Sequence, residues 1–123
     1  ISLGIDFTAR DLQNYLKERG LPWEKAKAFD GSALIGEWQP KTTKDMDNIN
    51  FHLHKNGHTV QQVNTSLMLW KTDELIAHIS TYITLKTGDV IFTGTPAGVG
   101  KVSPGDRLEG YLEGKKVFAV DIK

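Results

Sequence analysis

In residues 50–63, Phe51 and Leu53 alternate with His52 and His54, Asn56-Gly57 follows, and the apolar residues Val60 and Val63 come after it. Alternation with a period of two is typical of strands with one buried face, and Asn-Gly is a preferred dipeptide for the type I′ turn between two strands. This segment is therefore predicted to be a β-hairpin. The tail over 107–122 is predicted in the same way, as two strands on either side of Glu113-Gly114. Strands joined by hairpins are thus expected to dominate the fold.

Two helices are predicted between the strands. One covers about residues 8–19, with Thr8 as its N-cap and Gly20 as its stop, and the other covers about 72–84. Shorter elements are expected as strands over 1–7, 33–38 and 89–93 and as a polar surface loop over 39–48. Nothing in the pattern divides the chain, so residues 1–123 are expected to belong to one α+β domain.

Composition excludes several classes of function. The 123 residues carry 15 Lys and Arg against 15 Asp and Glu, so there is no basic field for nucleic acid or an anionic membrane. The chain contains no cysteine, which removes disulfides, thiolate metal sites and a cysteine nucleophile. No apolar run approaches the roughly 20 residues that span a bilayer. A cytoplasmic protein without nucleic-acid or membrane partners is expected.

Asp6 stands near the end of the apolar strand predicted over 1–7. A carboxylate there is costly unless a metal ion, a basic side chain or a substrate pairs with it. Arg10 and Gln13 lie three residues apart on the predicted helix, on the face opposite its apolar stripe. That stripe consists of Leu12, Tyr15 and Leu16. The three polar side chains either share a ligand pocket, or Asp6 and Arg10 form an ion pair that ties strand to helix while Gln13 is solvated.

Lys27 lies in a short connection after Pro22 and Trp23, between Ala26 and Ala28. An ammonium group surrounded by small apolar residues is well placed to meet an enolate or a carboxylate. The alternative interpretation is a solvated lysine on a loop.

The glycine-rich segment from Thr93 to Gly100 does not match the phosphate-binding motifs. Lys101 is followed by Val102, which excludes a Walker A loop, and the third glycine of GxGxxG is missing. The segment is instead interpreted as a tight turn after a strand. Either its backbone amides and the Thr95 hydroxyl face a ligand, or its glycines only permit the turn.

His52 and His54 share one face of the first hairpin strand and are spaced to chelate zinc. They alternate with Phe51 and Leu53, so they are expected on the exposed side of the hairpin. Because no third ligand is evident, they are interpreted as surface histidines.

Four blocks taken together resemble the fumarylacetoacetate hydrolase family, over nearly the whole chain. They read GIDFTARDLQ at 4–13, LPWEKAKAFDGSALIG at 21–36, NTSLMLWKTDELIAHIS at 64–80 and TLKTGDVIFTGTPAGVG at 84–100. The chain is most similar to small members that act as acylpyruvases, oxaloacetate decarboxylases or hydroxyheptadienedioate isomerases. Such a resemblance implies a rolled, mixed β-sheet, a homodimer, a small 2-oxo acid substrate and a role in the catabolism of aromatic compounds.

The resemblance also implies a divalent cation, generally Mg²⁺ with Mn²⁺ or Ca²⁺ as alternatives, held by three or more carboxylates. Asp6 matches the metal-binding aspartate of the family. Five further residues match the substrate pocket: Lys27 and Gln13 in catalytic roles, and Arg10, Gly94 and Thr95 in substrate binding. The carboxylate and keto oxygens of a 2-oxo acid are hard donors that suit such a cation. The cation would stabilise an enolate when the neighbouring C–C bond breaks, and Lys27 and Gln13 would add charge and hydrogen bonds.

The family's other metal ligands, an E-x-E pair, and its His–Glu acid/base pair lie upstream of the strand that holds Asp6. This chain is therefore expected to be the C-terminal part of a catalytic domain whose N-terminal portion is absent, and to be inactive alone. The alternative function is a non-catalytic β-scaffold for subunit association or ligand binding.

Overall fold

The computed structural model describes residues 1–41 and 45–123, and it confirms a strand-dominated α+β fold with two α-helices. Residues 42–44 of the predicted loop at 39–48 lie outside the described residues. The elements are β1 (Gly4–Asp6), α1 (Arg10–Glu18), the 3₁₀ turn η1 (Glu24–Ala26), β2 (Ala33–Ile35), β3 (Asn50–Lys55), β4 (His58–Asn64), the 3₁₀ turn η2 (Thr65–Leu67), α2 (Thr72–Ser80), β5 (Arg107–Leu112) and β6 (Lys115–Asp121).

The larger sheet has the order β4-β3-β5-β6, and all its strand pairs are antiparallel. Both predicted hairpins are confirmed. Asn56 and Gly57 have φ of 52° and 80°, and Glu113 and Gly114 have φ of 51° and 77°, as two-residue turns with both central residues left-handed require. The pairs in the described residues are antiparallel throughout, so the parallel pairs of a mixed sheet are not among them.

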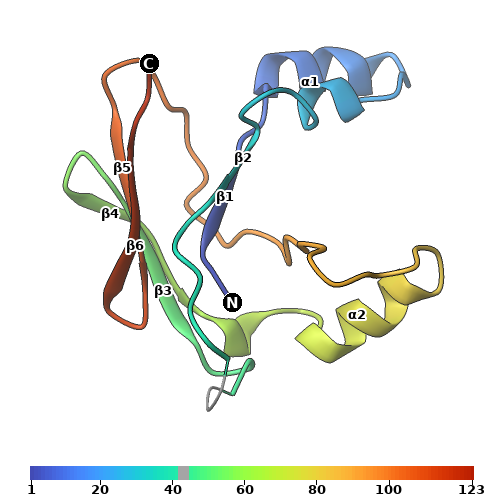
Figure 1. The fold of residues 1–123 in the computed structure, drawn as a ribbon. Helices are drawn as coiled ribbons and strands as arrows, with labels where there is room; N and C mark the ends of the chain where they lie inside the picture. The colour runs from blue at the N-terminus through green and yellow to red at the C-terminus, as the bar shows by residue number, and fades with distance from the viewer. Residues whose placement is uncertain (42–44) are drawn as a thin grey trace.

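β1 and β2 form a separate two-stranded antiparallel sheet that lies beside the larger one (Figure 1). The chain leaving β2 joins the two sheets, because Gly36 N–H donates to Leu3 O and Glu37 N–H donates to Val117 O. A Cβ at Gly36 would lie 2.9 Å from Val117 O and 3.0 Å from Leu3 O, so only glycine fits this crossing. The small core beneath it centres on Ile49, Leu112 and Val117.

The predicted strand at 89–93 is wrong for the described residues, in which this segment is not a strand. Its sequence has strand-like residues, but no neighbouring strand supplies ladder hydrogen bonds. Phe92 instead packs its ring against the backbone of Gly4 in β1. Intrinsic preference for a strand is weak without a paired neighbour.

α2 ends at Ser80, several residues before the predicted end near Thr84. The Ser80 and Thr81 hydroxyls donate to the carbonyls of Ile76 and His78, and the backbone N–H groups of Thr81 and Tyr82 make the tighter i→i−3 bonds. Side-chain bonds of this type compete with helix propagation. No helix of the described residues is long and apolar enough to cross a membrane.

α1 begins at Arg10 with Ala9 as its N-cap, so the prediction of Thr8 as N-cap is wrong. Its predicted faces are also partly wrong. Gln13 and Leu16 are the buried residues of α1, whereas Leu12 and Tyr15 are exposed. The helix is rotated toward Gln13 because its N-terminal end is bound to η1, where Ala9 N–H donates to the carbonyl of the fully buried Ala26.

Candidate functional site

The carboxylate of Asp6 meets the ammonium of Lys27 at the end of β1. The Lys27 Nζ lies 2.5 Å from Asp6 Oδ2 and donates a second hydrogen bond of 2.8 Å to Thr8 Oγ1. The side chains of Lys27 and Asp6 are 29% and 45% exposed, so the pair remains open to a ligand. Asp6 therefore pairs with Lys27, and not with Arg10 as the ion-pair interpretation held.

The 3₁₀ turn η1 places Lys27 opposite the strand. Lys27 N–H donates to Glu24 O, which closes the turn, and buried Ala26 fixes it against the start of α1. On the other side of β1, Phe7 N–H donates to Ser32 O. The lysine is thus held on a short, anchored connection, so its interpretation as a freely solvated loop residue is wrong.

Arg10 and Gln13 form their own pair on α1. Arg10 Nη1 donates to Gln13 Oε1 at 2.8 Å, and Gln13 is only 5% exposed. A buried amide whose oxygen accepts from a guanidinium holds that guanidinium in one direction. The expectation that Gln13 lies solvated on a polar face is wrong, and the pocket interpretation of this pair fits its burial.

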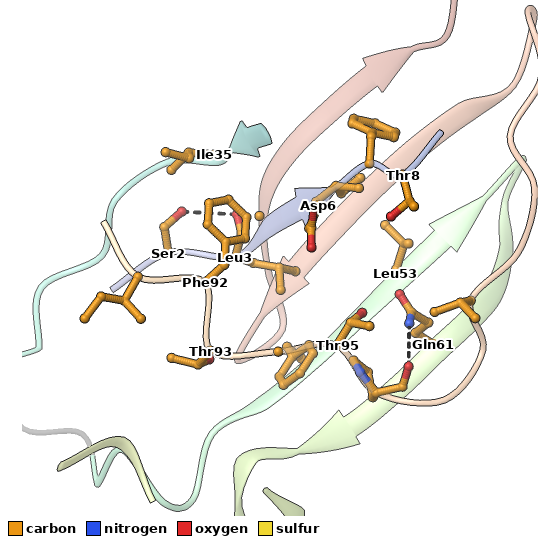
Figure 2. Close-up of a pocket in the computed structure, with 18 of the residues that line it drawn as sticks. Ser2, Leu3, Asp6, Thr8, Ile35, Leu53, Gln61, Phe92, Thr93 and Thr95 are labelled. Carbon is orange, nitrogen blue, oxygen red and sulfur yellow. Dashed lines mark hydrogen bonds between the residues drawn. The ribbon is translucent and has the colours of Figure 1, made fainter. Parts of the chain in front are cut away.

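Gly94 and Thr95 reach the same region from the opposite side of the cavity. Figure 2 shows Asp6 and Thr8 on β1 and its exit, with Thr93 and Thr95 on the glycine-rich segment across from them. Gly94 has φ of 118°, a conformation that side chains rarely adopt, so the chain turns there just before Thr95.

One cavity of about 1200 Å³ joins all of these groups. Its lining includes all six site residues that were predicted from the sequence, namely Asp6, Arg10, Gln13, Lys27, Gly94 and Thr95. Phe92 and Leu53 contribute apolar walls. Two cations, one carboxylate, an amide and a hydroxyl therefore converge on a space large enough for a small organic acid.

Asp6 suits one position of a divalent-cation site, because its carboxylate is a hard oxygen donor on the cavity wall. Across residues 1–41 and 45–123, no group of three or more His, Asp or Glu side chains is arranged to hold a metal ion. The donor chemistry thus fits Mg²⁺ or Mn²⁺ with Asp6 as one protein ligand. Mg²⁺ is commonly bound by only one or two protein carboxylates when substrate oxygens supply further ligands.

The histidines of β3 lie elsewhere, on the other face of the larger sheet. His52 stacks on Tyr111 with ring centroids 4.5 Å apart, and His54 lies 4.9 Å from both rings. Both are partly buried and lie on the side opposite Phe51 and Leu53, which line the cavity. Burial lowers the pKa of His52, and the nearby charge of His54 lowers it further.

Two residues near the site were missed by the sequence reasoning. Thr8 binds Lys27, and its position two residues after Asp6 was a usable signal, since residues two apart share a face in a strand. Gln61 on β4 donates to the carbonyl of Pro96 in the glycine-rich segment. That contact joins residues 35 apart, and no local pattern indicates it.

Residues 1–122 match the family model described as the C-terminal domain of fumarylacetoacetate (FAA) hydrolase. Among curated relatives, the oxaloacetate tautomerase YcgM of Escherichia coli K12 is 44% identical over 114 residues, which are 91% of this chain and 52% of that protein. A fumarylpyruvate hydrolase of a Ralstonia species is 39% identical over 111 residues, or 90% of this chain and 58% of that protein. The chain spans about half the length of the curated relatives it matches.

Solved structures give the same result. A fumarylacetoacetate hydrolase family protein from Yersinia pestis CO92 superposes with a TM-score of 0.93 at 41% identity, covering 99% of this chain and 56% of that one. The fumarylpyruvate hydrolase of Pseudomonas aeruginosa, solved in complex with Mn²⁺ and pyruvate, gives a TM-score of 0.89 at 36% identity, with 98% and 52% covered.

Proposed function

Since the chain belongs to the fumarylacetoacetate hydrolase family, we propose that the complete protein containing it is a divalent-cation-dependent enzyme that enolises small 2-oxo acids. The complete protein here means these residues with any that flank them in the gene product. The observation that carries the proposal is that Asp6, Lys27, Arg10 and Thr95 line the same cavity.

The residues of this chain have distinct tasks in that reaction. Lys27 donates hydrogen bonds to the keto oxygen of the substrate, whose negative charge grows during enolisation. Asp6 and Thr8 hold the ammonium group of Lys27 in place. Arg10, held by buried Gln13, pairs with a substrate carboxylate.

Thr95 offers a hydroxyl to the far carboxylate end of the substrate, and Phe92 and Leu53 limit access of water. A bound divalent cation supplies Lewis-acid stabilisation of the developing oxyanion. Within this chain Asp6 is its proposed ligand. We propose that carboxylates outside the described residues complete the cation site, that an acid/base pair outside them takes the proton leaving the substrate carbon, and that these 123 residues alone are inactive.

Oxaloacetate is the leading substrate in this proposal. Support comes from the tautomerases of E. coli and of Schizosaccharomyces pombe, each 44% identical to this chain over its matched residues. Acylpyruvate hydrolysis is the second candidate, supported by the Ralstonia relative. Both reactions pass through an enol or enolate next to the carboxylate, so one pocket chemistry serves either of them.

A substrate panel tests the proposal. The complete protein is assayed with oxaloacetate and fumarylpyruvate in Mg²⁺, in Mn²⁺ and in EDTA, and enol decay, pyruvate release and loss of the acylpyruvate absorbance are followed separately. We expect turnover of at least one substrate that EDTA abolishes and Mg²⁺ or Mn²⁺ restores. A folded complete protein without turnover or 2-oxo acid binding would contradict the proposal and favour the non-catalytic scaffold.

We further propose that the complete protein is a homodimer. Large apolar side chains of the segment after β4 are exposed, with Leu69 97% and Trp70 64% accessible, and such patches are typical of interaction surfaces. Light scattering at micromolar concentration would give twice the subunit mass, and a monomer would contradict this part of the proposal.

A further inference from the structure

The glycine-rich segment that carries Thr95 is bound to β4 by one side chain. Gln61 Nε2 donates to Pro96 O at 3.1 Å and, more weakly, to Ala97 O at 3.4 Å. Figure 2 shows this amide reaching across from β4 to the segment beside Thr95. In the described residues, backbone hydrogen bonds do not reach Gly94 to Gly100, so the amide of Gln61 is the polar anchor of this stretch.

The backbone of the segment also lies directly on β4. Gly98 has φ of 97°, and a Cβ there would come 2.2 Å from Val60 O and 3.0 Å from Gln61 Cγ. Glycine therefore permits a contact that any other residue would prevent. The hydrogen bonds of the Gln61 amide and the close backbone contact at Gly98 therefore hold residues 96–98, which are one to three residues after Thr95.

The far end of the segment has its own anchor on β3. Lys55 Nζ donates to Lys101 O at 2.7 Å and pairs with Asp106 Oδ2 at 2.8 Å. The hairpin thus holds the segment at two points, by Gln61 just after Thr95 and by Lys55 at Lys101, directly after Gly100. Because Thr95 precedes the Gln61 anchor by only one residue, its position is the most directly dependent on that amide.

We propose that Gln61 is a positioning residue for substrate binding, which acts by fixing the Pro96 and Ala97 carbonyls so that Thr95 faces the carboxylate end of the 2-oxo acid. This inference rests on the proposed function. An amide is required here because the side chain must donate to carbonyl oxygens. A carboxylate of the same shape has no donor and would face those oxygens with a negative charge.

The test is a Gln61→Glu variant of the complete protein, with Gln62→Glu as its matched control. Gln62 carries the same amide one residue later but is exposed and pairs with His52 at the other face of the sheet. With oxaloacetate and Mg²⁺, Gln61→Glu is expected to raise KM by on the order of tenfold, which is about the effect of losing one hydrogen bond. The change in kcat is expected to be less than about threefold. Gln62→Glu is expected to leave both constants unchanged.

A double-mutant cycle separates positioning from a general structural effect. If Gln61 acts through Thr95, the KM effect of Gln61→Glu is expected to disappear in a Thr95→Val background. Multiplicative effects of the two changes on KM would overturn the inference, as would an unchanged KM in Gln61→Glu.

Hydrogen exchange gives a readout that does not depend on turnover. The amides of 94–101 are expected to exchange faster in Gln61→Glu than in Gln62→Glu or the unmodified protein, while those of β5 and β6 remain the same. Equal exchange in all three proteins would overturn the inference. Absence of turnover in the unmodified protein would instead contradict the proposed function, and exchange would still decide whether Gln61 anchors the segment.

Discussion

The larger sheet and the region that carries the site differ in how their backbones are held. In the sheet, four strands pair along their lengths and two tight turns set the register. In the site region, β1 and β2 have three residues each, and residues 81–106 contain neither helix nor strand. The sheet is fixed by its ladders, whereas the site depends on individual side-chain bonds. Changes in the sheet should therefore alter stability, and changes at the site should alter kinetics.

Loss of the Lys27 ammonium is expected to have the largest effect. Lys27→Met in the complete protein should lower kcat by about 10²–10³-fold, because it removes the donor aimed at the developing oxyanion. The midpoint of thermal unfolding should change little, since a partly exposed ion pair contributes little to stability. Lys25→Met is the control, because Lys25 lies exposed in the same turn. Equal activity of the two variants would contradict the role given to Lys27.

A change inside the larger sheet should lower the stability of the protein and leave its kinetic constants unchanged. A Cβ at Gly110 would lie 2.1 Å from the Phe118 ring, so Gly110→Ala is expected to reduce the free energy of unfolding by about 1–3 kcal/mol. KM of the folded enzyme should stay the same. Gly100→Ala is the control for stability, since a Cβ there has nothing within 4 Å. Urea unfolding of both variants measures the difference, and equal midpoints would show that the close packing is easily relaxed.

Thr8 is expected to act at the site with a smaller effect. Thr8→Val removes the 2.8 Å hydrogen bond to Lys27 Nζ and should lower kcat by about tenfold, because a hydrogen bond to a charged group contributes about 1.5–3 kcal/mol and Asp6 still pairs with the ammonium in the variant. Thr8→Ser keeps the hydroxyl and should retain most of the activity. If serine and valine behave alike, packing of the methyl group and not the hydrogen bond is what matters.

The smallest expected effect is on the acid dependence of stability. Hydrogen bonds from Lys55, Asn56 and the Ser103 backbone lower the pKa of Asp106 from 3.8 to about 2. A folded pKa below the unfolded value stabilises the fold above about pH 4, and this contribution is lost as the pH falls from about 4 to about 2. Asp106→Asn should therefore flatten the loss of stability in that window. Asp30→Asn, at an exposed position, serves as the control in urea titrations from pH 2 to 7.

Features set by neighbouring residues were predictable from the sequence. The turn residues Asn56-Gly57 and Glu113-Gly114 located both hairpins, because two adjacent residues with positive φ are typical of a two-residue turn between antiparallel strands. The six candidate site residues came from three of the four sequence blocks, and the structure places all six on one cavity.

Features that depend on distant partners were not predictable in this way. The apolar run at 89–93 was expected to be a strand, but strand formation needs a neighbour to pair with. The orientation of α1 followed from the bond between Ala9 and Ala26, so that Gln13 and not Leu12 became buried. The Gln61 anchor depends on a loop lying against β4, which no local periodicity encodes.

Binding of Mn²⁺ tests most directly whether the cavity is a metal and 2-oxo acid site with Asp6 as a ligand. Isothermal titration of the complete protein with Mn²⁺, alone and with pyruvate, is compared for the unmodified protein, Asp6→Asn and Asp30→Asn. Asp6→Asn is expected to weaken Mn²⁺ binding by at least about tenfold, since loss even of outer groups at metal sites costs 10–100-fold. Asp30→Asn should bind as the unmodified protein does. Equal Mn²⁺ affinity in Asp6→Asn and the unmodified protein would contradict the account.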